Sequence, residues 1–257
     1  MVGKTKLLLV GVVLSVLLVS CSSGASCVPP DHMDCENADL SGVDLSGVDL
    51  SGADLRLINL SGANLSYANL TGANLTSADL TSADLNHANL TRASLIGANL
   101  KGADLTSADL NRANLTRASL IGANLKGANL IGANLTSADP IEADLNFANL
   151  GGANLTSANL TSANLTGADL NRANLNYANL AGANLTSANL EGADLIEADL
   201  NYANLSSANL QSANLNKANL NKANLTSAFL FSANLNKANM TDVNLKGATM
   251  PDGTIHD

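Results

Sequence analysis

A five-residue period is the feature that most constrains the fold of this chain. From Leu40 to Leu245 nearly every fifth residue is Leu, and nearly every such Leu follows Ala-Asp or Ala-Asn. A short unit repeated about forty-three times is typical of a solenoid, in which each unit packs on its neighbours instead of building one globular core. The pattern therefore predicts an elongated repeat protein.

The period of five excludes an α-helix. At about 100° per residue, Leu residues five positions apart would lie about 140° apart, so no apolar stripe would form. In extended backbone, Ala53 and Leu55 share one face while Asp54 points to the other. The next two residues of each unit, such as Ser61 and Gly62, are small and turn-prone. We therefore expect short strands joined by corners.

The tandem A(D/N)LXX pattern resembles the pentapeptide-repeat family over about four-fifths of the chain. The resemblance implies an all-β fold, a right-handed quadrilateral β-helix with four pentads per coil and with Leu and Ala pointing inward. At the usual strand separation, such a rod is roughly 50 Å long. The expected core includes Leu55, Leu65, Leu75, Leu100, Leu125, Leu150, Leu175 and Leu200.

The Asp or Asn before each Leu also repeats in register, so it predicts ladders of hydrogen-bonded side chains along the outside of the rod. For most of these carboxylates and amides, the sequence therefore favours a structural role over a chemical one. Pro140 occupies a Leu position, where it removes a ladder donor and predicts a local bulge or kink in a continuous rod.

The N-terminus is typical of a secretory signal. Lys4 and Lys6 precede an apolar run over 7–19, which is too short to span a bilayer but suits a signal-peptide core. The run ends at Ser20-Cys21 and resembles a bacterial lipobox, which implies cleavage before Cys21 and lipid attachment to its sulfur. The alternative is an ordinary signal peptide with a chance Cys. We therefore expect a signal peptide over 1–20 and a lipid-anchored protein of the bacterial envelope, in the outer membrane if the cell has two.

A linker over 21–37 holds two further cysteines. Cys27 and Cys35 are an even pair, and in an oxidising compartment they predict a disulfide that closes an N-terminal loop. A metal site formed with His32 is the alternative, but it lacks a fourth ligand. Such a loop would cap the first coil against pairing with other chains.

The repeat, expected over 38–250, decays towards its end, and 251–257 form a predicted cap that folds over the last coil. Pro251-Asp252-Gly253 is a strong turn signal. Phe229 and Phe231 are expected to be exposed on one side, where they contact either this tail or a second molecule. The family resemblance implies that a homodimer can form through the C-terminal ends.

The outward residues single out no side of the rod. If residues twenty apart stack, the Asp residues are spread over all four sides, and Arg92, Arg112 and Arg172 share one of them. A segment starting at Thr81 recurs from position 106, an offset of five pentads where a coil takes four. Growth by repeat slippage therefore moves equivalent residues from one side of the rod to another. Such growth indicates that the length of the rod is maintained and not a binding site on one of its sides.

No catalytic constellation is evident. The three histidines, His32, His87 and His256, are far apart, and no nucleophile has a base placed by a recognisable motif. We therefore expect a non-catalytic protein without cofactor or metal. The sequence favours a lipid-anchored structural spacer or protein-interaction scaffold that meets an envelope protein of unknown identity.

The alternative is a DNA mimic. The family resemblance implies acidic rods that occupy the DNA site of a type II topoisomerase such as gyrase. Without the signal peptide the chain carries 11 basic and 22 acidic residues, a net charge of −11, which would repel nucleic acid itself. An envelope location speaks against this alternative, because an exported protein never meets gyrase.

Overall fold

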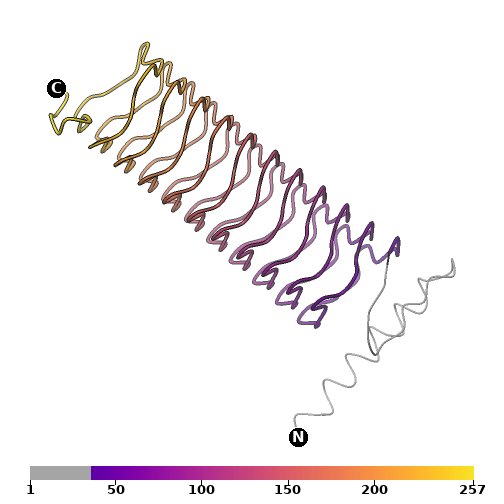
Figure 1. The fold of residues 1–257 in the computed structure, drawn as a ribbon. Helices are drawn as coiled ribbons and strands as arrows, with labels where there is room; N and C mark the ends of the chain where they lie inside the picture. The colour runs from indigo at the N-terminus through magenta and orange to yellow at the C-terminus, as the bar shows by residue number, and fades with distance from the viewer. Residues whose placement is uncertain (1–35) are drawn as a thin grey trace, which may run out of the picture.

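The computed structural model describes residues 36–257, which form a straight rod of similar coils with the two ends of the chain at opposite ends of the rod (Figure 1). Cys21, Cys27, Cys35 and the expected signal peptide lie outside the described residues. Residues 36–257 contain no helix, and hence none long and apolar enough to cross a bilayer. Their β-structure consists of single bridged residues, one in each pentad from Asp39 to Thr249, with Ile255 added in the C-terminal tail.

The parallel bridges fix the length of a coil. Each of them joins residues twenty positions apart, as Asp39 does with Asn59, so one coil takes up twenty residues. The bridges fall into four ladders, called here ladders 1 to 4 after their first residues, Asp39, Asp44, Asp49 and Asp54. The ten intervals between residues 39 and 239 correspond to about 48 Å.

We number each pentad from its first turn residue, so that residues 61–65 form one pentad with Ala63 third, Asn64 fourth and Leu65 fifth. The interior holds the third and fifth residues of each pentad. Between Ile58 and Leu230 every Ala or Leu at these positions is at most 1 % exposed. The eight Leu residues named above as core are all at most 2 % exposed. Burial of each Leu side chain contributes about 2 kcal/mol, so the stability of the rod grows with the number of coils.

The second residue of each pentad makes the corner possible. Its φ is positive throughout the repeat, for example 64° at Gly62 and 58° at Arg92. In the same turn, the N–H of Ala63 donates to the carbonyl of Leu60 at 3.0 Å, which closes a type II turn. Gly adopts this conformation freely, whereas for other residues the left-handed conformation costs about 1–2 kcal/mol of free energy. Burial of the neighbouring Ala and Leu offsets that strain.

Asp or Asn at the fourth position completes the hydrogen bonding of the backbone. The N–H groups of the second and fifth residues donate to the following coil, that of the fourth donates to the preceding coil, and that of the third closes the turn. The N–H of the first residue instead donates to the side chain two residues earlier, as Ser66 does to Asn64 Oδ1 at 3.0 Å. This fifth donor explains why the motif requires Asp or Asn.

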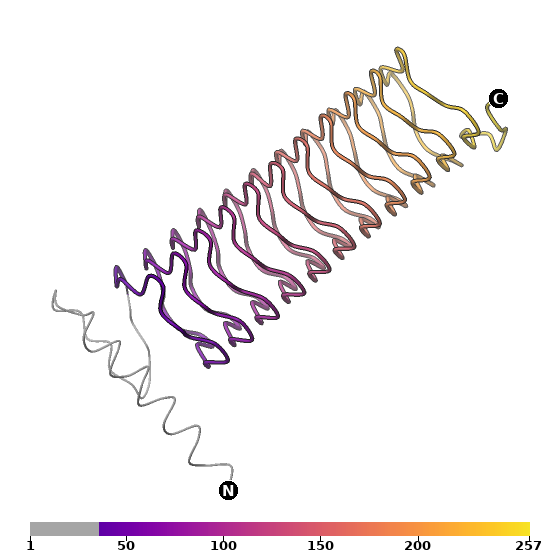
Figure 2. The ribbon, with the colours of Figure 1, turned by 180° about the vertical axis from the view of Figure 1, so that it is seen from behind.

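Pro140 interrupts one ladder without bending the rod. The bridge between Asp139 and Asn159 is missing, and the bond from Leu120 N to the carbonyl of Asp139 is 3.1 Å long, against 2.7 Å for Leu115 and Leu125. The register of twenty is the same on both sides of Pro140, so no residue is inserted. The prediction of a bulge is therefore wrong, and the rod shows no kink from either side (Figures 1 and 2).

The C-terminal tail covers only part of the last coil. Ile255 pairs antiparallel with Thr249, and the N–H of His256 donates to the carbonyl of Ala248 at 2.8 Å, so the tail closes the end of ladder 3. At the ends of the other ladders Leu235, Met240 and Leu245 are half-buried, and within the described chain their N–H groups have no backbone acceptor. The predicted cap over the last coil is thus present at ladder 3 and leaves the ends of the other ladders open.

Candidate functional site

Side-chain ladders cover the outside of the rod, as the repeat predicts. Asn59 Nδ2 donates to Asp39 Oδ1 at 2.9 Å, and the same contact recurs in the coils beyond. Elsewhere the chain of bonds passes through Thr, as where Asn134 Nδ2 donates to Thr116 Oγ1 at 3.0 Å. The prediction of hydrogen-bonded ladders is confirmed. These bonds leave few of the Asp, Asn and Thr side chains free for a ligand.

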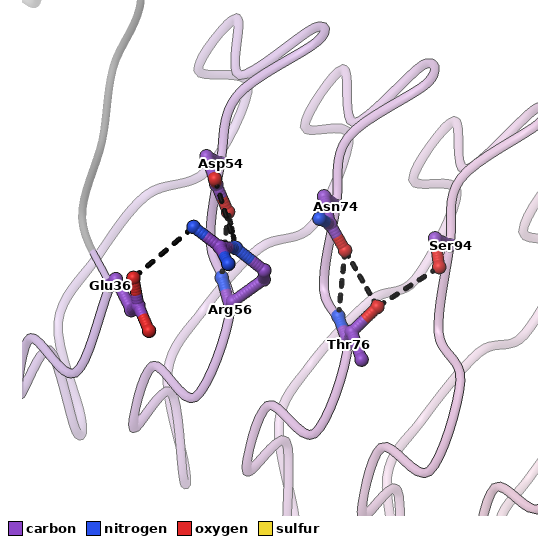
Figure 3. A network of polar contacts seen from close by, with 6 residues as sticks. All are labelled: Glu36, Asp54, Arg56, Asn74, Thr76 and Ser94. Atoms are coloured by element: carbon purple, nitrogen blue, oxygen red, sulfur yellow. Dashed lines mark hydrogen bonds and ion pairs between the residues drawn. The ribbon is translucent and has the colours of Figure 1, made fainter.

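An ion-pair network closes the first coil of the rod (Figure 3). Arg56 Nε donates to Asp54 Oδ1 at 2.8 Å, and Arg56 Nη2 donates to Glu36 Oε2 at 3.1 Å. The hydrogen bond from Arg56 lowers the pKa of the Asp54 carboxyl. One coil further on, Thr76 Oγ1 donates to Asn74 Oδ1 at 2.6 Å. The network therefore ties the start of the described chain to the rod.

The carboxylates of the ladders act as turn acceptors. The pKa of Asp39 and that of Asp44 are lowered because the N–H of Ser41 or Ser46 donates to the carboxylate. Within residues 36–257, no three His, Cys, Asp or Glu side chains lie close enough to hold a metal ion. His87 stacks on the ring of Tyr67, with centroids 4.9 Å apart. Asp39 and Asp44 are thus engaged in the turns of the rod, and His87 is engaged with Tyr67.

The open C-terminal end is one candidate interaction site. Phe229 and Phe231 stack with their centroids 6.3 Å apart and are 39 % and 42 % exposed. The tail passes close to Phe231, since a Cβ added at Gly253 would lie 3.5 Å from the ring of that residue. The exposed aromatic pair and the half-buried apolar residues of the last coil therefore belong to the same end of the rod.

A second candidate follows ladder 4 through six coils. We call it the arginine side and define it as ladder 4 with the turn on each side of it, residues 71–77, 91–97, 111–117, 131–137, 151–157 and 171–177. It carries Arg92, Arg112, Arg117 and Arg172, and it has no Asp, Glu or Lys. All four arginines are exposed.

The arginine side is not visible in the sequence when residues are assigned to sides by the ladder positions alone. Arg92 and Arg117 occupy the second position of their pentads, which is part of a corner. Their two corners flank the same ladder, so the copy offset of five pentads leaves both arginines on one side of the rod. Grouping the turn residues that lie twenty positions apart in the sequence would have shown that these arginines flank one ladder.

The fold and these two surfaces define a non-globular repeat protein with an invariant interior. The family model of pentapeptide repeats matches the chain in eight copies, whose ranges together cover residues 31–137 and 141–247 and leave out Pro140. The chain belongs to the pentapeptide-repeat family. Proteins of this family are generally structural or interaction proteins and not enzymes.

Several solved structures are similar to this chain. HetL, a pentapeptide repeat protein involved in heterocyst differentiation regulation in the cyanobacterium Nostoc sp. strain PCC 7120, is 38 % identical, with 93 % of this chain and 98 % of HetL covered and a TM-score of 0.48. Rfr23 from the cyanobacterium Cyanothece 51142 is 42 % identical over 40 % of this chain and 64 % of its own, with a TM-score of 0.29. QnrB1, a plasmid-mediated fluoroquinolone resistance protein, is 17 % identical over 79 % of this chain and 89 % of its own, with a TM-score of 0.48. A search of curated proteins found no match.

Proposed function

We propose that this protein is a lipid-anchored envelope protein whose rod serves as a protein-interaction scaffold. The observation that supports it best is the contrast between a constant interior and a varied exterior. The third and fifth positions are nearly always Ala and Leu, whereas the exposed second position holds residues as different as Gly62, Tyr67, Arg92 and Glu197. A rod of this kind presents side chains at fixed spacings without rearranging its core.

Anchoring at Cys21 would place the membrane at the N-terminal end of the rod. The described coils begin at Glu36, only fifteen residues after that Cys. A scaffold anchored in this way would stand away from the membrane and expose its sides and its C-terminal end. We further propose that the rod is a right-handed four-sided helix; the twenty-residue register and the four ladders support the four sides, and the right hand is implied by the family.

The open C-terminal end supports a homodimer formed through that end. Leu235, Met240 and Leu245 are half-buried, and within the described chain their N–H groups have no backbone acceptor; Phe229 and Phe231 are exposed at the same end of the rod. A second copy stacked on this end would cover the apolar residues and the free backbone donors together. Wild-type protein should sediment as a dimer, and a variant with Leu235→Lys and Met240→Lys should sediment as a monomer with the same circular dichroism spectrum.

DNA mimicry finds less support on this rod. A mimic of the duplex would present closely spaced negative charges along its length. Here Asp residues are separated by Asn in most ladders, and one side carries no carboxylate through six coils. The net charge of −9 is therefore spread without the periodicity of a nucleic acid.

Fractionation and mass spectrometry of the wild type and the Cys21→Ala variant test the anchoring. We expect the wild-type chain to begin at a lipid-modified Cys21 in the membrane fraction, and the variant to be unprocessed or released. An unmodified wild-type chain in the cytosol would overturn the envelope function and make inhibition of gyrase supercoiling the next assay.

Two deletions distinguish a scaffold from a passive spacer. Removing residues 146–165 deletes one coil and leaves every later residue on its own side. Removing residues 146–150 shortens the rod less but moves every later residue to the preceding ladder. A scaffold should lose its envelope crosslinks more fully with the five-residue deletion. A spacer should respond only to the lost length, so a larger effect of the twenty-residue deletion would contradict the scaffold.

A further inference from the structure

The arginine side differs from the rest of the rod in the type and the sign of its charges. Four of the five arginines of the chain lie on it, and the fifth, Arg56, lies in the first coil on the same ladder and is paired with Asp54 and Glu36. Among the lysines of the described chain, Lys217 and Lys237 flank ladder 4 only beyond residue 197, and the others lie in the turns on either side of ladder 2. The side ends abruptly at 191–197, where Glu191, Asp194 and Glu197 follow one another. From residue 74 to residue 174 it spans five intervals, or about 24 Å.

The guanidinium groups of this side are available to a partner. In the described part of the chain, none of the four arginines forms an ion pair. The carboxylates nearest to Arg112 and Arg172 in sequence are Asp109 and Asp169, on ladder 3. Asp109 instead accepts the N–H of Asn111 and the amide of Asn129, each at 3.0 Å, and Asp169 is bonded in the same way.

Small residues leave room around these side chains. Arg112 leans towards the following coil, where a Cβ added at Gly132 would lie 3.6 Å from its Cγ. The relation of Arg172 to Gly192 is the same, at 3.5 Å. The arginine stems therefore lie along the rod over glycine, and their charged ends remain exposed.

The composition of this side is that of a protein interface. Interfaces between proteins are enriched in Arg and aromatic residues and depleted in Lys, Asp and Glu. Alongside its arginines the side exposes Tyr177, Ile131 and Ile96, which are 57 %, 40 % and 37 % exposed. An apolar component of this kind has no role in binding a simple polyanion.

We propose that the arginine side binds the carboxylate-bearing surface of an acidic protein. The inference rests on the proposed scaffold function and names its docking surface. Arg pairs with carboxylate through two parallel hydrogen bonds, so four fixed arginines select a matching pattern of Asp and Glu side chains. The exposed Tyr177, Ile131 and Ile96 favour a protein over a densely charged polymer such as DNA, which offers them no apolar surface.

Binding of defined polymers by the full-length protein tests this chemistry. The probe is a random copolymer of glutamate and tyrosine, and the comparators are polygalacturonate, duplex DNA and vesicles containing phosphatidylglycerol. The test variant replaces Arg92, Arg112, Arg117 and Arg172 by Ser, a residue that adopts the same left-handed φ at Ser107. The matched control replaces four lysines in the turns beside ladder 2 by Ser, which changes the net charge equally; they are Lys101, Lys126, Lys222 and Lys246.

We expect the arginine variant to bind the glutamate–tyrosine copolymer at least roughly tenfold more weakly than the wild type, and the lysine control to remain within about twofold of it. Equal losses in both variants would reduce the effect to net charge and overturn the proposal. Preferential binding of the sugar polymer, the DNA or the vesicles would overturn it in favour of that class of ligand. An absence of copolymer binding by the wild type would also overturn it.

Photocrosslinking in cells separates this proposal from the scaffold function itself. Ser137 lies on the arginine side and Ser162 on the turn between ladders 1 and 2, and Tyr177 and Tyr202 show that each of these turn columns accommodates a bulky side chain. A photoreactive residue at position 137 should give crosslinks to Asp- or Glu-rich peptides that disappear in the arginine variant. Crosslinks from position 162 alone would overturn the arginine side but leave the scaffold function standing. A rod without crosslinks at either position would overturn both.

Discussion

The middle of the rod and its last coil share one motif but differ in how completely that motif is satisfied. Leu155, in the middle, is fully buried, and its N–H donates to the following coil at 2.7 Å. Leu245 occupies the same position of its pentad, yet it is half-buried and, within the described chain, has no backbone acceptor. The difference shows that a pentad is stabilised by its neighbouring coils and not by its own sequence.

Truncation of a core Leu should separate the two regions most strongly. Leu155→Ala should lower the free energy of unfolding by about 2–5 kcal/mol, because it opens a cavity between two closed coils. Leu245→Ala should lower it by less than about 1 kcal/mol, because that side chain already meets solvent. Urea denaturation measures both changes, and equal losses would contradict neighbour-dependent stability.

Loss of a ladder amide should show the same contrast on the outside. Asn154 accepts the N–H of Thr156 at 3.1 Å and its hydroxyl at 2.7 Å, and it donates to Thr136. Asn154→Ala should therefore reduce the free energy of unfolding by about 1–3 kcal/mol. Asn244 accepts a single bond, from Lys246 N at 3.2 Å, so Asn244→Ala should have less than half of that effect in the same assay. A larger loss of unfolding free energy in Asn244→Ala than in Asn154→Ala would contradict the difference between the middle of the rod and its last coil.

Replacing Pro140 by the Leu of the repeat should restore the hydrogen-bonding pattern of the neighbouring coils in the middle of the rod. Pro140→Leu restores the missing donor to ladder 1 and the apolar side chain of the repeat. We expect the free energy of unfolding to rise by about 1 kcal/mol. The bond from Leu120 N, now 3.1 Å long, should shorten towards the 2.7 Å of its neighbours in a crystal structure of the variant. A destabilised variant would show that this coil has adapted to proline.

The smallest effect concerns the first coil, where an ion pair adds to the backbone contacts. The pKa of Asp54 is lowered in the folded protein, so the pair contributes stability above the ordinary Asp pKa of about 3.9 and loses it as the pH falls through the lower, folded value. Thermal unfolding of the wild type and of Arg56→Gln should therefore differ slightly at pH 6 and converge near pH 2. A difference that persists at the acid end would exclude the ion pair as its source.

Much of the rod could be predicted because one repeated position determines each feature. Leu at every fifth position excluded a helix, and Ala two residues before it identified the buried face. The role of Asp or Asn as acceptor for the first N–H of the next pentad was not predicted, because this bond depends on the geometry of the corner. Positive φ at residues such as Arg92 and Tyr67 was equally hidden, since their side chains do not favour it.

The surfaces were harder to predict because they depend on three-dimensional register and on the end of the chain. Placing Arg112 and Arg117 on one side required knowing that their two turns flank the same ladder. Exposure of Phe229 was expected from its sequence position, but the limited reach of the tail was not, because Pro251-Asp252-Gly253 defines a turn and not the length of ladder that it covers.

The unfinished last coil also indicates how such a protein can form during its synthesis. Every coil emerging from a ribosome would for a time present what the final coil presents permanently, a row of free N–H groups and half-covered leucines. The exposed face of that coil is a template for the next twenty residues, so the rod can fold from the N-terminus one coil at a time. The contacts that each new layer must find lie about twenty residues away in sequence, whatever the final length of the rod.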